Sequence, residues 1–135
     1  MSEEDLERIG YELYALRARA EELQRQANAL NEMAEAAEAT GESISGLGRE
    51  AVFQLGAGTM TKAAPFGKIL VETGAGVVVE KAPDEAKKVV EAREAEARAA
   101  LAHVQKELTE VVARTRELNE RAEKLRKGAE GLPAQ

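Results

Sequence analysis

Two copies of a glycine-rich motif near the middle of the chain have the residue types that could bind a phosphate. They read Leu55-Gly56-Ala57-Gly58 and Thr73-Gly74-Ala75-Gly76. A phosphate-binding loop continues as GxGxxG, or ends in Gly-Lys-Ser/Thr at the start of a helix, where backbone N–H groups cradle the anion. Neither copy continues in either way. We therefore interpret both copies as bends between strands and expect no cofactor.

The residue types that bind metals or perform catalysis are also poorly represented. His103 is the single histidine and the chain has no cysteine, whereas a metal site requires several converging ligands. Glutamates are spread along predicted helix faces like ordinary solvated flanks. No nucleophile stands with a base and an orienting group. We predict that the protein binds no metal and is not an enzyme.

The composition is typical of long or coiled-coil helices. Of the 135 residues, 3% are aromatic and 33% are charged, and the net charge is -6, so an ordinary globular core is excluded. Lysines and arginines are interleaved with acids, which argues against nucleic-acid binding. The acidic start precedes no apolar run, and no stretch approaches the roughly 20 apolar residues of a membrane span. We expect a cytoplasmic protein that binds neither nucleic acid nor membranes.

Apolar residues recur in alternating steps of three and four residues in the first part of the chain, the heptad spacing that keeps one seam facing a partner helix. These residues are Leu6, Ile9, Leu13, Leu16, Ala20, Leu23, Ala27, Leu30, Ala34 and Ala37. The spacing predicts a coiled-coil helix over 1–40. The glycines Gly41, Gly46 and Gly48 disfavour further helix, so we predict a linker over 41–50.

A second helix is predicted over 82–127, followed by a flexible tail over 128–135. Pro83, Asp84 and Glu85 suit a first helical turn, and a leucine and valine stripe runs from Leu101 to Leu125. Lys87 and Glu94 interrupt this stripe near its start. If the segment between the helices turns the chain back on itself, the two helices form an antiparallel pair.

The segment 51–81 is predicted to form two linked β-hairpins, each bent at a Gly-Ala-Gly motif. Isolated hairpins are barely stable and expose unpaired edges. We therefore expect them to pair with strands of other chains. The apolar strand residues predicted to mediate this oligomerisation are Val52, Phe53, Leu55, Met60, Ile69, Val71, Val77 and Val79.

The ends of the helices away from the hairpins are the predicted binding site. Leu6, Ile9, Leu13, Leu118 and Leu125 lie there with no core beyond them. One interpretation is that they close the coiled coil, and the other is that a fraying end offers apolar surface to another apolar chain. Both interpretations are compatible with the sequence.

The order of helix, two hairpins and helix resembles the alpha-type subunit of prefoldin, especially the archaeal kind. The most specific segment is Thr73-Gly74-Ala75-Gly76-Val77 followed by Glu80-Lys81-Ala82-Pro83-Asp84-Glu85-Ala86. The resemblance covers nearly the whole chain, and two hairpins mark the alpha type, because beta-type subunits have one. The short glycine-rich linker departs modestly from the family pattern.

The resemblance implies a mainly α fold with a small β part: a long antiparallel coiled coil joined by two β-hairpins that oligomerise into a β-barrel platform. It implies an ATP-independent holdase, with two alpha-type and four beta-type subunits, that binds unfolded clients at the coiled-coil tips and delivers them to a group II chaperonin. The alternatives are a filament or scaffold of the alpha-prefoldin type and a coiled-coil adaptor for one folded partner.

Overall fold

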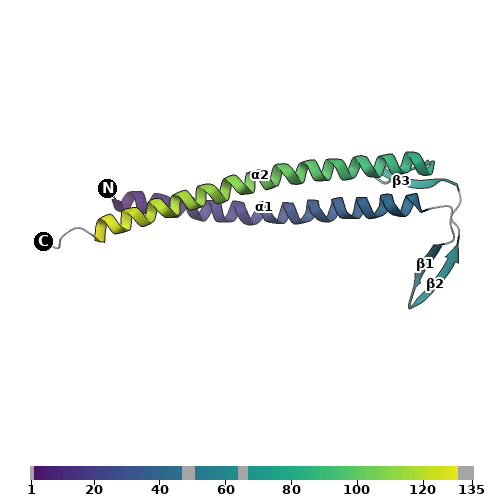
Figure 1. Ribbon diagram of the computed structural model, residues 1–135, viewed down its shortest axis with the longest axis horizontal. Helices are drawn as coiled ribbons and strands as arrows, with labels where there is room; N and C mark the ends of the chain where they lie inside the picture. Colours follow the sequence, from purple (N-terminus) through teal and green to yellow (C-terminus); the bar gives the residue numbers. More distant parts are fainter. Residues whose placement is uncertain (1, 47–50, 64–66, 131–135) are drawn as a thin grey trace. The chain divides into compact units, whose positions relative to one another are not determined.

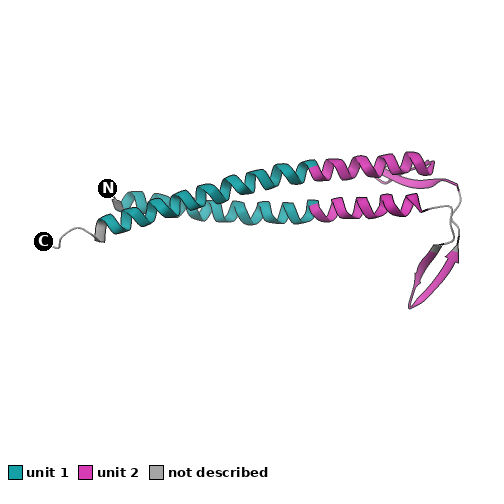
Figure 2. Ribbon diagram, in the orientation of Figure 1, with its two compact units in different colours: residues 1–30, 99–135 teal, residues 31–98 magenta. Residues whose placement is uncertain are grey.

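The computed structural model describes residues 2–46, 51–63 and 67–130, and it consists of two long helices and four short strands (Figure 1). The elements, in chain order, are α1 (Ser2–Ser45), β1 (Ala51–Gly56), β2 (Thr59–Ala63), β3 (Ile69–Gly74), β4 (Val77–Lys81) and α2 (Pro83–Glu130). The chain divides into a terminal unit, residues 1–30 and 99–135, and a hairpin unit, residues 31–98 (Figure 2). None of the helices, over the described residues, is long and apolar enough to cross a membrane.

Helix α1 runs beyond its predicted end at residue 40 and finishes at Ser45, so residues 41–45 are helix and not linker. The reason is burial. Gly41 and Ile44 continue the three-and-four spacing of the apolar stripe, and both are buried. Ile44 packs against Ala86 and Val90 of α2, and this apolar contact outweighs the cost of about 1 kcal/mol that a glycine imposes within a helix.

Helix α2 begins at Pro83, close to its predicted start, and continues to Glu130, three residues past its predicted end. Proline is tolerated in the first turn because the N–H it lacks has no partner there. Acidic Asp84 and Glu85 follow and complement the positive end of the helix dipole. The rest of the predicted tail, residues 131–135, lies outside the described residues.

In the terminal unit, α1 and α2 lie side by side and run in opposite directions (Figure 1). Two apolar clusters hold them together. The first has Ile9, Leu118 and Ala122 at its centre, and the second has Leu23, Ala27 and Val104, with Leu30, Leu101, Leu108 and Val111 packed around them. The predicted antiparallel pairing is therefore present in this unit.

In the hairpin unit, a third cluster joins the end of α1, the start of α2 and strand β3. Val71 of β3 is buried with Ile44, Ala86 and Val90. Arg93 of α2 also donates a hydrogen bond to the backbone carbonyl of Glu72. The β3–β4 hairpin is thus attached to the helices both by apolar burial and by a charge-assisted hydrogen bond.

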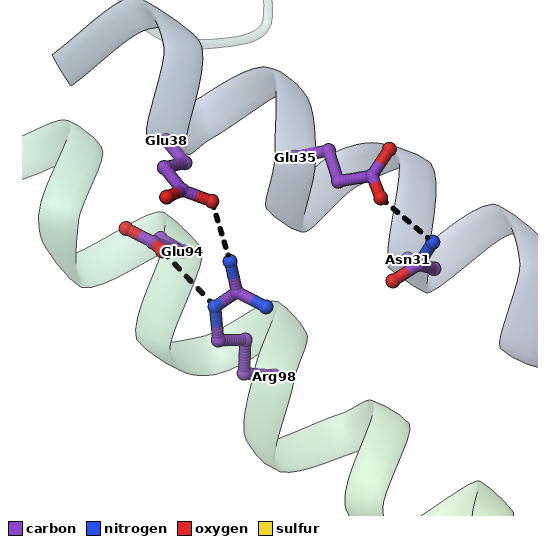
Figure 3. Close-up of polar contacts among 5 residues, drawn as sticks. All are labelled: Asn31, Glu35, Glu38, Glu94 and Arg98. Carbon is purple, nitrogen blue, oxygen red and sulfur yellow. Dashed lines mark hydrogen bonds and ion pairs between the residues drawn. The ribbon is translucent and has the colours of Figure 1, made fainter. Parts of the chain in front are cut away.

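The two polar residues that interrupt the α2 stripe, Lys87 and Glu94, are half-buried, and each lies beside a side chain of opposite charge. Glu94 is half-buried and accepts a hydrogen bond of 3.0 Å from Nε of Arg98, whose Nη2 donates to Glu38 of α1 at 2.9 Å (Figure 3). Lys87 lies 3.9 Å from Glu91 on the same helix. The heptad register therefore continues through these polar positions to the start of α2.

The two hairpins are built identically around their Gly-Ala-Gly motifs. In β1–β2 the pair Gly56↔Thr59 encloses two residues, and in β3–β4 the pair Gly74↔Val77 does the same. The enclosed residues all have positive φ, at 50° for Ala57, 75° for Gly58, 51° for Ala75 and 76° for Gly76. Positive φ at both central positions defines a type I′ turn, whose twist matches that of paired strands. The duplicated motif is therefore a turn signal, as the sequence predicts.

A valine at position 76 tests this turn. Gly76 has a φ of +76°, and a Cβ there would meet nothing within 4 Å, so any penalty comes from the backbone alone. We expect Gly76→Val to cost about 1–3 kcal/mol and to speed hydrogen exchange in β3 and β4. The control is Gly10→Ala in α1, which also meets no neighbouring atom and should add up to about 1 kcal/mol of helix stability. A Gly76→Val hairpin with unchanged exchange rates would contradict this account of the turn.

Candidate functional site

The predicted client-binding residues are gathered at the end of the terminal unit, where α1 begins and α2 ends. Ile9 is 5% exposed and Leu118 is 1% exposed, and the two pack together. Leu6, Leu13 and Leu125 are half-buried around them. The structure thus brings all five residues together as the closed seam of the helix pair, with three of them still reachable from solvent.

One flank of this seam is lined by interhelical ion pairs. Glu12 of α1 accepts a 3.0 Å hydrogen bond from Arg114 of α2, and Arg19 of α1 donates one of 2.8 Å to Glu107. The hydrogen bonds to Glu12 and then to Glu117 raise the pKa of Arg114 above its ordinary value. Such exposed pairs contribute about 0–1 kcal/mol each, so they set the register of the helices more than they stabilise them.

Two further polar side chains, those of His103 and Glu22, are accessible to solvent. His103 is exposed and lies 3.1 Å from Glu107 on the same helix. Hydrogen bonds from Arg25 and then Gln26 lower the pKa of Glu22, which is accessible to solvent. Among the described residues, no three His, Cys, Asp or Glu side chains converge as metal ligands.

The β1–β2 hairpin carries apolar side chains on both of its faces. Successive residues of a strand point to opposite faces, so Val52 lies on one face and Phe53 on the other. Met60 pairs with Gln54 and so lies on the face of Val52, and Leu55 lies at the register shift between Gln54 and Gly56. These four side chains are 40–69% exposed. A two-stranded sheet with two apolar faces cannot bury either face by itself, which indicates an interface.

The predicted oligomerisation residues of the β3–β4 hairpin fall into two groups, one packed on the chain's own helices and one exposed. Val71 is 6% exposed and Ile69 is half-buried, because both pack on the helix cluster of their own chain. Val77 and Val79 are 55% and 38% exposed. The chain itself therefore covers two of the eight predicted residues, and the others remain accessible.

Sequence reasoning missed several exposed apolar residues. Leu70 and Val78 are 66% and 53% exposed on β3 and β4, and Met33 and Val112 are 59% and 48% exposed on the helices. A signal was available for Leu70: it stands between Ile69 and Val71 in an unbroken apolar run, the pattern of a strand covered on both faces. No periodic signal distinguishes Met33 or Val112 from other residues beside the seam.

The family model described as "Prefoldin subunit" matches residues 3–128. The chain belongs to the prefoldin family. Prefoldins are chaperone-type subunits that assemble with other prefoldin subunits, and they are not an enzyme family.

Comparison with solved structures places the same fold in an archaeal prefoldin. A chain from the cryo-EM structure of filamentous PFD from Methanocaldococcus jannaschii matches with a TM-score of 0.63 and 17% sequence identity. The match covers 82% of this chain and 97% of that one. No curated protein sequence matches this chain. At this identity the likeness establishes the fold, and the family model establishes membership.

The seam at the end of this prefoldin subunit should be a major source of its stability. Leu118→Ala removes a side chain that is 1% exposed, and we expect it to lower the free energy of unfolding by about 2–5 kcal/mol. Tyr14→Ala, at a position 78% exposed, should change it by about 0.5 kcal/mol or less. Urea unfolding followed by circular dichroism measures both. Equal effects would show that the seam is open in solution.

Proposed function

We propose that this prefoldin subunit is an ATP-independent holdase that binds unfolded polypeptide at the end of its helix pair. The observation that supports it most directly is the cluster around Ile9 and Leu118, bordered by the half-buried Leu6, Leu13 and Leu125. Among the described residues no further buried cluster lies between this one and the ends of the helices, so separating the last turns costs only the burial of this cluster. Separation exposes Ile9 and Leu118 to an apolar segment of a client.

The two hairpins support the alpha type and the mode of assembly. Beta-type prefoldins have one hairpin, and this chain has two. In the proposal, the exposed apolar residues of β1–β2, with Val77 and Val79 of β4, pair with hairpins of other subunits in a β-barrel platform of two alpha-type and four beta-type subunits. Several helix pairs then hold one client, so weak binding at each end suffices through effective concentration. Delivery to a group II chaperonin in the cytoplasm completes the proposal.

Substitution of the half-buried leucines tests client binding. The triple variant Leu6→Ser, Leu13→Ser and Leu125→Ser should lose most suppression of the aggregation of a chemically denatured client, measured by light scattering without ATP. Met33→Ser removes a large apolar side chain that is 59% exposed in the hairpin unit, and it should retain suppression. Circular dichroism and native mass confirm that helix content and assembly are unchanged. Full suppression by the triple variant, or by a chain lacking residues 1–10 and 120–135, would show that this end does not bind clients.

A filament or scaffold function is the second candidate, and the fold match to a filamentous archaeal prefoldin favours it. Both candidates use the hairpins. We expect Leu55→Glu, at a position 69% exposed on β1, to reduce the native mass of the assembly because it places a charge in an apolar interface. Met33→Glu on α1 should leave the native mass unchanged. Assembly that survives Leu55→Glu would exclude this face of β1–β2 as the interface.

Native mass spectrometry and electron microscopy of the wild-type chain distinguish the two candidates. A defined hetero-hexamer that forms only with a beta-type subunit supports the holdase. Long homopolymers of the chain alone support the filament. Binding of one folded partner, without binding of unfolded clients, would instead indicate an adaptor.

A further inference from the structure

The two flanks of the helix pair in the terminal unit differ in how their charges are satisfied. The first flank carries the ion pairs Glu12–Arg114 and Arg19–Glu107, at 3.0 and 2.8 Å, and His103 also contacts Glu107. Glu12, Arg19, Glu107 and Arg114 therefore have partners across the two helices. Lys106 and Glu110, which line a groove on this flank, form no ion pair among the described residues.

The second flank has a groove of about 450 Å³ between the same helices. Ala20 of α1 and Val112 and Thr115 of α2 supply its apolar surface, and Val112 is 48% exposed. Half-exposed apolar side chains beside a seam mark a surface suited to another helix. Unlike the first flank, this groove is not crossed by an ion pair among the described residues.

Charges around this second groove are separated by sign. Arg17 and Arg116 lie at the end near Val112, and Glu120 and Glu123 lie further along α2. At 1.5 Å per residue, Arg116 and Glu123 are separated by about 10 Å along the helix. Among the described residues, Arg17, Arg116 and Glu120 form no ion pair, and Glu123 contacts only the exposed Lys127, at 3.4 Å.

We propose that this groove is an interface with a second copy of the chain, arranged antiparallel about a two-fold axis near Asn119. Across a two-fold axis the same surface of each copy forms the contact. If residue i of the first copy meets residue j of the second, residue j of the first also meets residue i of the second. Arg116 of each copy then faces Glu120 of the other. The apolar side chains between these charges are covered by the same contact.

The charge pattern favours a second copy over other occupants. An uncharged apolar segment would leave Arg17, Arg116 and Glu120 without partners, and a polyanion would be repelled by Glu120 and Glu123. A second copy of the same surface supplies positive and negative side chains at the spacing of the charges around this groove. This interface is separate from the hairpins and from the leucines proposed to bind clients, so it is tested without assuming the chaperone function.

Disulfide formation tests the axis in the full chain, which contains no cysteine of its own. Asn119→Cys places a thiol next to its symmetry mate, and mild oxidation should convert most of the protein into a covalent dimer. Glu110→Cys is the matched control, because Glu110 is also exposed on α2 but lines the groove of the first flank. We expect at least about tenfold less dimer from Glu110→Cys. Equal yields from the two variants, or no dimer from Asn119→Cys, would overturn the proposal.

Charge reversal tests the contact between Arg116 and Glu120. In the Asn119→Cys background, Arg116→Glu and Glu120→Arg should each lower the dimer yield about fivefold or more, because two-fold symmetry replaces two attractive pairs by two repulsive ones. The double variant Arg116→Glu, Glu120→Arg restores opposite charges and should restore the yield. Failure of the double variant to recover would overturn the pairing.

Two further measurements separate this inference from the proposed function. The loss of native mass in Leu55→Glu reports assembly through the hairpins, and aggregation suppression reports client binding. A chain that assembles and suppresses aggregation but gives no Asn119→Cys dimer disproves the second-copy interface alone. If Arg116→Glu instead abolishes suppression and no dimer forms, the groove binds clients and the second-copy proposal is wrong.

Discussion

Close packing between α1 and α2 is the constraint on which the other features depend. Large side chains of one helix lie against small ones of the other: Leu101 packs on the buried pair Leu23 and Ala27, and Ala122 lies beside Ile9. Alanine at alternate seam positions lets the two backbones approach. The approach brings side chains that flank the seam within hydrogen-bonding distance, so that the ion pairs fix an antiparallel register.

The hairpin unit has its own contacts between the same two helices. Because the helices are antiparallel, the end of α1 and the start of α2 meet, and Ile44 can share a cluster with Ala86, Val90 and Val71. That cluster holds one hairpin against the helices. The other hairpin keeps apolar side chains exposed on both faces. The two hairpins have the same turn but different exposed apolar surface, since only β3–β4 buries apolar side chains against the helices of its own chain.

The buried state of the binding end has a consequence for function. Ile9 and Leu118 stabilise the closed helix pair and would also be the most apolar contacts for a client, so the same side chains cannot do both at once. In the proposed function, client binding therefore competes with closure of the seam. Under that proposal, release without a nucleotide requires weak binding at each end, and this competition would keep it weak.

The element order, both hairpin turns and the antiparallel pairing are predictable from the sequence, because heptad spacing, the Gly-Ala-Gly motifs and Pro83 are local signals. The other features depend on contacts between residues that are distant in the chain. Gly41 stays helical because Ile44, one turn further on, is buried against Val71, Ala86 and Val90, which are distant in the sequence. Val71 faces its own helices, whereas Leu70 faces outward, since packing chooses which face of a uniformly apolar strand is covered. The unequal flanks likewise depend on which charges of α1 and α2 the pairing brings together.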